Sequence, residues 1–370
     1  MKEPAQFTRT TERIFKPGIR LSDLPRPKWW GKTIKFFKTL EVIIFKILES
    51  FDLYRPSKSI VGIPTLAMRH STSLQAVVYN GTQEEVLGFK ARRLLHRLIP
   101  GIPDLESFER IRFQVATSEN QFRSIEASTE NRGFVHLQVP WELQKSTPKT
   151  SWLRIQPVGV ETLLGCIRLG NYEVLSAPVF FLNSNIKWII VSDIDDTIKD
   201  SKIGETTGFR AILRGLFKGH YYKYEAIDGM AELYQKLIAQ NCLIVYVTST
   251  PYQLSPFLLK FLRERGFPEG PVFMRWLGYG RFGHKWRTLH RIFSQLEGQR
   301  VILIGDSGEQ DLQIYRRVSE SAPSKESVAK ILIRHIAGTA LPTSPKPNEI
   351  FYKDIPSLER EIHQILSSAP

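Results

Sequence analysis

The sequence predicts two structural classes in one chain: a mostly β, sandwich-like part and then an α/β part with a parallel sheet. The first prediction rests on about seven stretches of β-forming residues from Ser57 to Leu182, separated by turn signals such as Asn80-Gly81. The second rests on later apolar runs that have the length of buried strands and end in polar residues. In open α/β sheets, ligand sites lie beyond such strand ends. From these patterns we expect a basic arm with an amphipathic helix at 1–56, a β-rich domain at 57–183 and an α/β domain at 184–370.

The charge balance of the chain limits the kinds of partner that it is expected to bind. The 370 residues carry a formal net charge of +14. Such a balance favours an acidic partner: a phosphorylated substrate, an anionic membrane surface or nucleic acid. The two cysteines, Cys166 and Cys242, lie in apolar runs, which argues against a disulfide scaffold and a cysteine-ligated metal site. Because no signal peptide is visible, we expect a cytoplasmic protein, with peripheral membrane contact as a further expectation.

An amphipathic helix is predicted over Ile34–Leu48, inside the basic arm of residues 1–56. Its apolar positions recur at spacings of three and four residues: Phe37, Leu40, Ile44 and Ile47. Charged residues interrupt the run, so it is too polar to span a bilayer. Two interpretations stay open. The helix lies in a membrane interface, or it packs against the β-rich or the catalytic part.

The β-rich part is predicted from stretches that alternate or cluster β-formers. They are Ile60–Met68, Leu74–Tyr79, Ile111–Thr117, Phe122–Ser128, Gly133–Val139, Trp152–Val158 and Tyr172–Phe181. A basic segment, Phe89–Leu98, is expected to connect two of them as a helix or loop. No catalytic constellation is visible among these stretches, so the chemistry is expected in the second half of the chain.

The stretch Lys187–Lys199 (KWIIVSDIDDTIK) is the strongest functional signal. A buried strand ends there in three carboxylates, Asp193, Asp195 and Asp196. Clustered carboxylates are electrostatically unfavourable unless a cation lies among them. Mg²⁺ is the natural candidate, because this hard ion takes carboxylates together with water and phosphate oxygens. The alternative interpretation is a strand followed by an Asp-rich turn.

The spacing Asp193-x-Asp195-x-Thr197 resembles the first motif of the haloacid-dehalogenase phosphohydrolase superfamily. The longer stretch Asp-Ile-Asp-Asp-Thr-Ile is similar to the catalytic domain of phosphatidate phosphatases of the actin-patch-protein type. This resemblance covers about Ile186 to Ile336. It implies a Rossmann-like parallel sheet of haloacid-dehalogenase type with a small cap. It also implies three further motifs in a fixed order.

The second and third motifs are present in that order. The strand Leu243–Val247 ends in Thr248 and Ser249, whose hydroxyls are candidate donors to a phosphoryl oxygen at a helix start. An ordinary helix cap is the alternative. Lys285, after Gly283-His284, is expected at the start of an amphipathic helix, where it neutralises phosphoryl charge.

The fourth motif follows the strand Val301–Ile304, which ends in a loop with Asp306 and Asp311. A plain turn and a helix-start acid are the alternatives for these residues. The resemblance implies that Asp193 is the nucleophile and forms an aspartyl-phosphate. It implies that Asp195 donates and later accepts a proton. Mg²⁺ is then held by Asp193, Asp306 and the backbone carbonyl of Asp195, while Asp311 steadies the loop or a metal-bound water.

Substrate selection is expected to involve a small cap at about 199–227. A helical pattern there places apolar residues on one face: Phe209, Ile212, Leu213, Leu216 and Phe217. Arg210 and Arg214 line a neighbouring face and are candidate substrate-binding residues. The helix either beds into an anionic membrane or covers the catalytic part. Arg275, which resembles an arginine of the same family, is a further candidate; it contacts substrate or snorkels from the sheet edge.

Three function hypotheses follow. The first is a Mg²⁺-dependent phosphatidate phosphatase that acts at a membrane surface. The second is a phosphatase on another large substrate, a nucleic-acid end or a phosphoprotein; nucleic acid is the less expected partner, because no recognition module is visible. The third is a catalytically silent scaffold whose β-rich part binds a partner. The sequence does not indicate an oligomeric state.

Overall fold

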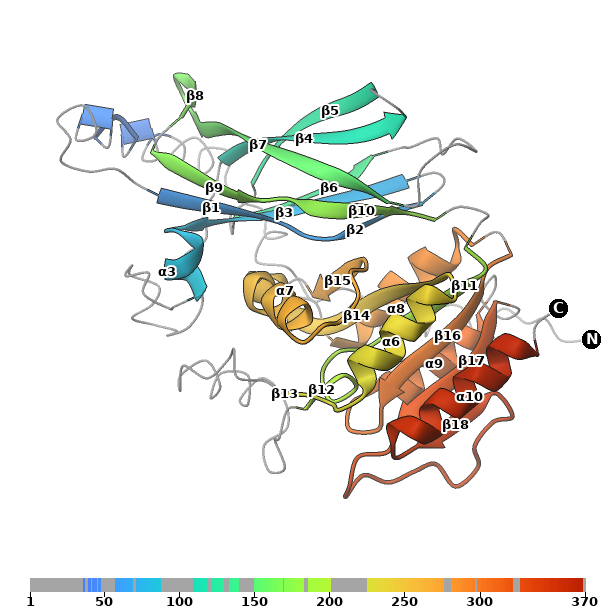
Figure 1. Ribbon diagram of the computed structural model, residues 1–370. Helices are drawn as coiled ribbons and strands as arrows, with labels where there is room; N and C mark the ends of the chain where they lie inside the picture. The colour runs from blue at the N-terminus through green and yellow to red at the C-terminus, as the bar shows by residue number, and fades with distance from the viewer. Residues whose placement is uncertain are drawn as a thin grey trace, which may run out of the picture.

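The computed structural model of the chain is shown in Figure 1. It describes most of residues 36–47 and residues 57–68, 71–87, 109–118, 121–129, 133–139, 150–182, 186–200, 225–275, 281–321 and 327–368, with single gaps at 169 and 297. Across these residues the protein is a mixed α/β structure with a β-rich N-terminal region, as predicted. A search of the same residues for membrane-spanning helices finds none of sufficient length and apolarity.

The β-rich region contains a ten-stranded sheet among the described residues. Its strands are β1 (Ser57–Gly62), β2 (Thr65–Met68), β3 (Ser71–Asn80), β4 (Glu109–Ser118), β5 (Gln121–Ser128), β6 (Phe134–Val139), β7 (Thr150–Thr162), β8 (Gly165–Ile167), β9 (Asn171–Leu175) and β10 (Ala177–Phe181). A short helix, α3 (Gln83–Leu87), follows β3. Strands β4, β5 and β7 at one end of the sheet share a buried core with β1 and β3 near the other, so the sheet curls over itself.

Two predicted strands are each divided in the structure. The predicted strand Ile60–Met68 breaks at Ile63-Pro64 into β1 and β2, because proline has no N–H to donate to a strand ladder. The predicted strand Tyr172–Phe181 breaks at Ser176: β9 pairs with β1, whereas β10 pairs with β2 and β7. The predicted sandwich is also corrected in one respect. Its strands form one continuous hydrogen-bonded sheet rather than two separate ones.

The α/β region is built on six parallel strands. They are β11 (Trp188–Ser192), β14 (Cys242–Pro251), β15 (Val272–Arg275), β16 (Arg300–Asp306), β17 (Val328–Arg334) and β18 (Glu349–Tyr352). Numbered one to six along the chain, they lie in the order 3-2-1-4-5-6. This is the order of a doubly wound sheet. Strands are added toward one edge from the first to the third strand, and toward the other edge from the fourth onward. Here that switch point lies between β11 and β16.

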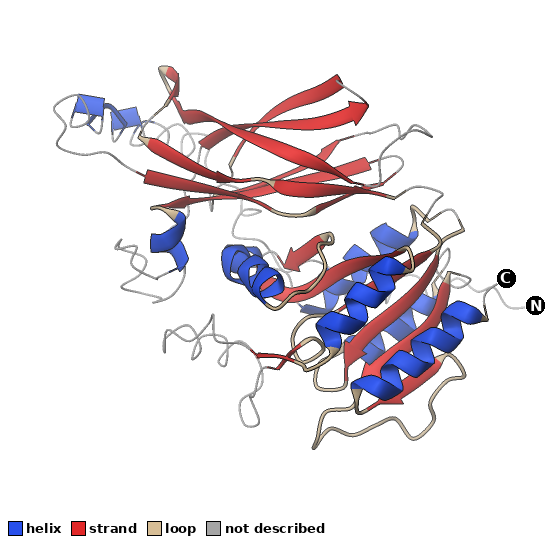
Figure 2. Ribbon diagram, viewed as in Figure 1, coloured by secondary structure: helices blue, strands red, loops and turns tan. Residues whose placement is uncertain are grey.

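Helices cover both faces of this sheet (Figure 2). One face packs against α6 (Met230–Ala239), α7 (Ser255–Glu264) and α10 (Ile355–Ser367); the other packs against α8 (Arg281–Phe293) and α9 (Asp311–Glu320). Successive strand residues alternate between the two faces. In β11, Trp188 and Ile190 belong to the first core, and Ile189 and Val191 belong to the second. A 3₁₀ turn, Tyr252–Leu254, joins β14 to α7.

The β-rich and α/β regions pack directly on each other. Alternate residues of β1 and β3, such as Val61 and Tyr79, point out of the β core and join the core around α6 and α7. The Tyr79 hydroxyl lies 2.9 Å from Ser255 Oγ. The rings of Phe134 and Tyr252 stack with centroids 4.2 Å apart. The two regions therefore share one buried, largely apolar core, although the boundary at 183/184 stays a prediction.

Several predicted segments fall partly or wholly outside the described residues. Phe89–Leu98 lies outside them, as does 201–224 with Arg210 and Arg214. The two ends of the predicted cap are nevertheless held together, since β12 (Lys199–Asp200) pairs with β13 (Glu225–Ala226). The described residues of 36–47 are helical, in agreement with the predicted amphipathic helix, although Phe37 is not among them.

Candidate active site

Two aspartates meet at the switch point of the parallel sheet. Asp193 directly follows β11, and Asp306 is the last residue of β16. The Asp193 N–H donates to the Ile304 carbonyl at 2.9 Å, which fixes the end of β11 against β16. Asp311, the first residue of α9, completes the cluster. One carboxylate oxygen from each of Asp193, Asp306 and Asp311 lies within 4.8 Å of the others, and all three residues are buried.

Lys285 supplies a positive charge to this cluster. Its Nζ lies 2.6 Å from Asp193 Oδ1 and 2.5 Å from Asp311 Oδ1, and the side chain is buried. Burial alone would lower the pKa of Lys285, but the Asp193 and Asp311 carboxylates outweigh it and raise the pKa well above its ordinary value. The lysine therefore stays charged. Lys285 was expected at a helix start; it lies instead in the second turn of α8, which begins at Arg281.

Asp306 is the acid in this cluster with the most evident unmet interaction. Its Oδ1 accepts from the N–H groups of Gly308 (2.6 Å) and Glu309 (3.0 Å). Its Oδ2 is buried and finds no hydrogen-bond partner among the described residues. Burial raises the pKa of Asp306 well above its ordinary value, and Asp311 adds to the rise. A buried carboxylate oxygen without a partner, beside two further carboxylates, fits a hard divalent cation such as Mg²⁺.

Gly305 makes the close approach of Asp311 possible. A Cβ at this position would lie 2.6 Å from Asp311 Oδ2 and 2.8 Å from a ring carbon of Tyr315. Asp311 Oδ2 in turn accepts a long bond, 3.4 Å, from the Asp306 N–H. The Gly-Asp pair of the fourth motif thus has a steric reason: only glycine leaves room for the acid of the next helix.

Asp195 lies outside the carboxylate cluster and has its own partners. Its Oδ2 accepts from the hydroxyls of Thr248 (3.1 Å) and Thr250 (3.0 Å), and its Oδ1 contacts Lys199 Nζ. Burial raises the pKa of Asp195, but Lys199 and the hydroxyl of Thr250 outweigh it and bring the pKa to about 2. Both oxygens are thus engaged, so any contribution of Asp195 to a metal site falls to its backbone carbonyl.

The strand that carries Thr248 and Ser249 differs from its predicted form. β14 extends to Pro251, and α7 begins only at Ser255, so these hydroxyls do not cap a helix start. Thr248 faces Asp195, whereas the buried Ser249 Oγ finds no partner among the described residues, so substrate binding by Ser249 stays a prediction. Arg275 Nε donates to the Ser249 carbonyl at 2.9 Å. The structure thus gives Arg275 a contact with the backbone of this motif.

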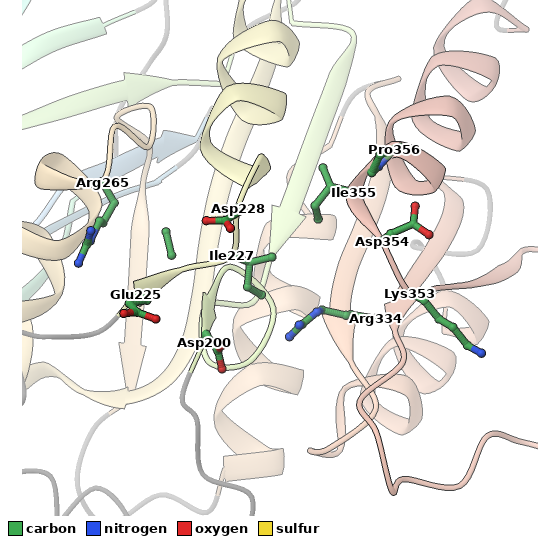
Figure 3. Close-up of a pocket in the computed structure, with 11 residues that line it drawn as sticks. Asp200, Glu225, Ile227, Asp228, Arg265, Arg334, Lys353, Asp354, Ile355 and Pro356 are labelled. Atoms are coloured by element: carbon green, nitrogen blue, oxygen red, sulfur yellow. The ribbon is translucent and has the colours of Figure 1, made fainter.

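The turn after Asp195 is held in a strained shape. Asp196 has a φ of 58°, in the left-handed region that non-glycine residues seldom adopt. Arg334, at the end of β17, donates to its carbonyl at 2.8 Å. Figure 3 shows the Arg334 side chain reaching toward the loop of Asp200 and Ile227. Asp200, Ile227 and Arg334 line a cavity of about 690 Å³ beside the catalytic turn. Its other walls include Arg265, Lys353, Glu225 and Asp228.

Sequence reasoning missed three contributors to this site: Lys199, Thr250 and Arg334. Thr250 could have been found, since residues two apart on a strand share a face with Thr248. Lys199 and Arg334 carry no such signal, because their contacts depend on the turn after β11 and on the placement of β17. By contrast, the structure brings Asp193, Asp306, Asp311 and Lys285 together.

Comparisons with known proteins concern mainly the α/β region. Residues 188–335 match the family model described as phosphatidate phosphatase APP1, catalytic domain. An uncharacterized protein of Schizosaccharomyces pombe is 30% identical over 162 residues, which cover 40% of this chain and 25% of that protein. Phosphatidate phosphatase APP1 of Saccharomyces cerevisiae is 30% identical over 145 residues, which cover 37% of this chain and 24% of that protein.

Solved structures give weaker similarity. A class C acid phosphatase from Bacillus anthracis with tungstate bound matches with a TM-score of 0.28 and 14% identity, over 51% of this chain and 81% of that one. A chain of the Pnkp1/Rnl/Hen1 complex matches with a TM-score of 0.29 and 14% identity, over 36% of this chain and 44% of that one. These overall similarities are too low to bear on the fold.

The match to the curated relatives spans about a quarter of their length, so it concerns one part of those proteins. The family-model match, residues 188–335, contains the residues gathered at the switch point, from Asp193 to Asp311. Residues 188–335 of this chain are therefore similar to the catalytic domain of phosphatidate phosphatase APP1.

Proposed function

We propose that this protein is a Mg²⁺-dependent phosphatidate phosphatase with a haloacid-dehalogenase-type catalytic fold. The observation that carries the proposal is the cluster of Asp193, Asp306, Asp311 and Lys285, which is buried at the switch point of the parallel sheet. Substrate phosphate and a metal ion meet at such a place in a phosphohydrolase. The cluster lies entirely within the segment that matches the APP1 catalytic domain.

In the first half of the proposed reaction, a carboxylate oxygen of Asp193 attacks phosphorus and the phosphate ester bond breaks. The products are an aspartyl-phosphate and the alcohol, diacylglycerol, whose oxygen takes a proton from Asp195. When bound, Mg²⁺ would neutralise the carboxylates and the phosphoryl oxygens, so that one anion can approach another. Lys285 Nζ, beside Asp193 Oδ1, stabilises phosphoryl charge from the protein side.

In the second half, water attacks the phosphorus of the aspartyl-phosphate and gives a proton to Asp195. Inorganic phosphate leaves, and Asp193 is restored. The contacts with Lys199, Thr248 and Thr250 hold Asp195 as a carboxylate, the form that this step needs. For the first half, Asp195 has to carry a proton. Its contact with Lys199 is then exchanged for one with the leaving oxygen.

Phosphatidate is the proposed substrate because the matched family model is named after a phosphatidate phosphatase. The net charge of +14 also favours an anionic substrate. The cavity beside the catalytic turn has mostly charged walls, among them Arg334, Lys353 and Glu225. Acids and bases are mixed in these walls, which therefore offer little to acyl chains. The acyl chains of phosphatidate would therefore stay at a membrane surface, and a cytoplasmic setting with peripheral membrane contact fits this arrangement.

The test is phosphate release from short-chain, soluble phosphatidate by the full chain, in Mg²⁺ and in EDTA. Asp193→Asn tests the nucleophile, and Glu269→Gln, at an exposed acid in the α/β region outside the cavity, is the matched control. We expect turnover in Mg²⁺, none in EDTA, and a loss of about 10³-fold or more in Asp193→Asn. The control should keep wild-type turnover.

Three further substrates separate the alternatives: an aryl phosphate, a 5′-phosphorylated oligonucleotide and a phosphopeptide. Turnover on any of these without turnover on phosphatidate would keep the catalytic centre and refute the lipid substrate. Failure on all four substrates, with a folded protein, would favour the silent scaffold.

A further inference from the structure

The exposed large hydrophobic side chains of the described residues are concentrated in one place. Among the described residues, eight large hydrophobic side chains are exposed: Phe36, Leu40, Ile43, Ile44, Ile47, Leu163, Leu164 and Leu341. The first five recur at helical spacing along 36–47, so they share one face of that helix. Leu163 and Leu164 form the turn between β7 and β8. Only Leu341 belongs to the α/β region.

The helix and the turn form one surface. The Leu163 N–H donates to Thr39 Oγ1 at 3.0 Å, and Thr39 and Val42 are buried on the inner side of the helix. In Figure 1 the blue helical segments lie next to β8, in agreement with this bond. One of the interpretations left open for this helix, packing of its apolar stripe against the β-rich part, does not describe Leu40, Ile44 and Ile47, which are exposed. The outer face of the helix is exposed, with Phe36 at 55%, and so is the turn, with Leu164 at 70%.

We propose that this surface, formed by helix 36–47 and the Leu163-Leu164 turn, binds an anionic lipid bilayer. Contiguous exposed apolar side chains mark an interaction site in a water-soluble chain. The sequence around the helix favours an anionic partner, because residues 28–49 contain five lysines against two glutamates: Lys28, Lys32, Lys35, Lys38, Lys46, Glu41 and Glu49. Trp29 and Trp30 precede the helix, and tryptophan is enriched at bilayer interfaces.

A second copy of the chain fits this surface less well. A symmetric contact would bring the same net positive segment of each copy together, and like charges repel. An anionic bilayer instead matches both properties, since an amphipathic basic helix inserts its apolar face and places its lysines at the lipid headgroups.

The surface acts as an anchor, separate from the catalytic centre. In Figure 1 the blue helical segments lie at the left-hand edge of the β-rich region, whereas β12, which directly follows the catalytic turn, lies in the α/β region. Membrane binding through this surface and chemistry at Asp193 can therefore fail independently. Substitutions on the surface are expected to change where the enzyme resides and to leave its turnover of a soluble substrate unchanged.

The experiment is flotation of the full chain with phosphatidylcholine vesicles, with or without about 30% phosphatidylserine. Two double variants probe the two halves of the surface: Ile43→Asp/Ile44→Asp on the helix and Leu163→Asp/Leu164→Asp on the turn. Leu341→Asp, at an exposed leucine elsewhere, is the matched control. Each double variant is expected to lower binding to anionic vesicles by about tenfold or more, and the control to leave it unchanged.

Turnover of soluble phosphatidate is measured on the same samples as a check of folding. Equal flotation of wild type and both double variants overturns the proposal, as does an equal loss in Leu341→Asp. A change from dimer to monomer in the variants, measured by light scattering without vesicles, would also overturn it and assign the surface to a second copy.

Discussion

Asp306→Asn gives the sharpest test of the carboxylate cluster, because the expected sign of its effect depends on Mg²⁺. Asp306 is buried, and its Oδ2 lacks a hydrogen-bond partner among the described residues. Without a cation, the ionised side chain is a cost to the folded state. We therefore expect the neutral asparagine to stabilise the metal-free protein, although it removes a proposed metal ligand.

The magnitude follows from the distances in the cluster. Two carboxylates whose oxygens lie within 4.8 Å of each other repel by at least about 3.5 kcal/mol at an effective dielectric constant of about 20. Two effects oppose the gain. The bonds from the N–H groups of Gly308 and Glu309 lose their ionic character, at about 1 kcal/mol each. Attraction to Lys285 is also lost, and the lost repulsion from Glu309 offsets it. The net expectation is a stabilisation of about 1–2 kcal/mol in EDTA.

In Mg²⁺ we expect the wild type to be more stable than Asp306→Asn, the reverse of the order in EDTA. At a free Mg²⁺ concentration about 100 times the dissociation constant, binding stabilises the wild type by about 2.7 kcal/mol. Asp306→Asn should gain little of this. The assay is equilibrium urea unfolding followed by tryptophan fluorescence, in EDTA and in Mg²⁺. Asp228→Asn is the control, and we expect it to stay within about 0.5 kcal/mol of wild type in both.

Two results would refute this reasoning. A variant less stable than wild type in EDTA would mean that the charge of Asp306 is satisfied by the protein alone. An equal Mg²⁺ effect in wild type and variant would mean that Asp306 is not a metal ligand.

Three further predictions concern the surroundings of the site and can be tested by urea unfolding. Gly305→Ala should cost about 1–3 kcal/mol and lower turnover, because the added Cβ displaces Asp311; unchanged turnover would contradict the steric argument. Burial lowers the pKa of His284 from 6.5 to about 3, and the neighbouring cations add to this effect. Between about pH 6.5 and pH 3, only the unfolded chain therefore takes up a proton on this residue. Stability should therefore fall as the pH drops below 6.5, by about 1.4 kcal/mol at about pH 5.5, and His284→Gln should remove this loss. Tyr79→Phe should cost about 1–2 kcal/mol, because Ser255 Oγ loses a buried partner; a cost near zero would show that the hydroxyl contact does not stabilise the packing of the two regions.

The α/β region was the more predictable half of the fold. Strands of a parallel sheet are covered on both faces and therefore read as continuous apolar runs, such as Ile189–Val191 and Val301–Ile304. The β-rich region was less predictable at its breaks. The break beside Pro64 carried a local signal, the proline itself, that the predicted strand did not take into account. The break at Ser176 carried none, because it depends on β9 pairing with β1 and β10 pairing with β2 and β7.

The candidate site shows the same division. Motif spacing led to Asp193, Lys285, Asp306 and Asp311, and the structure places their side chains in one cluster. The partners of Asp195 were not foreseen, since the predicted strand ended at Val247 and the observed one continues to Pro251. That extension puts Thr248 and Thr250 on the face toward Asp195. The roles of these residues in catalysis stay predictions.

The most direct measurement is a single turnover with phosphatidate that carries radioactive phosphorus in its phosphate, quenched in acid in the presence of Mg²⁺. The account predicts protein-bound label on the peptide containing Asp193, formed before phosphate appears and absent in Asp193→Asn. Mg²⁺-dependent phosphate release at a wild-type rate by Asp193→Asn would contradict it, as would covalent label on any other residue.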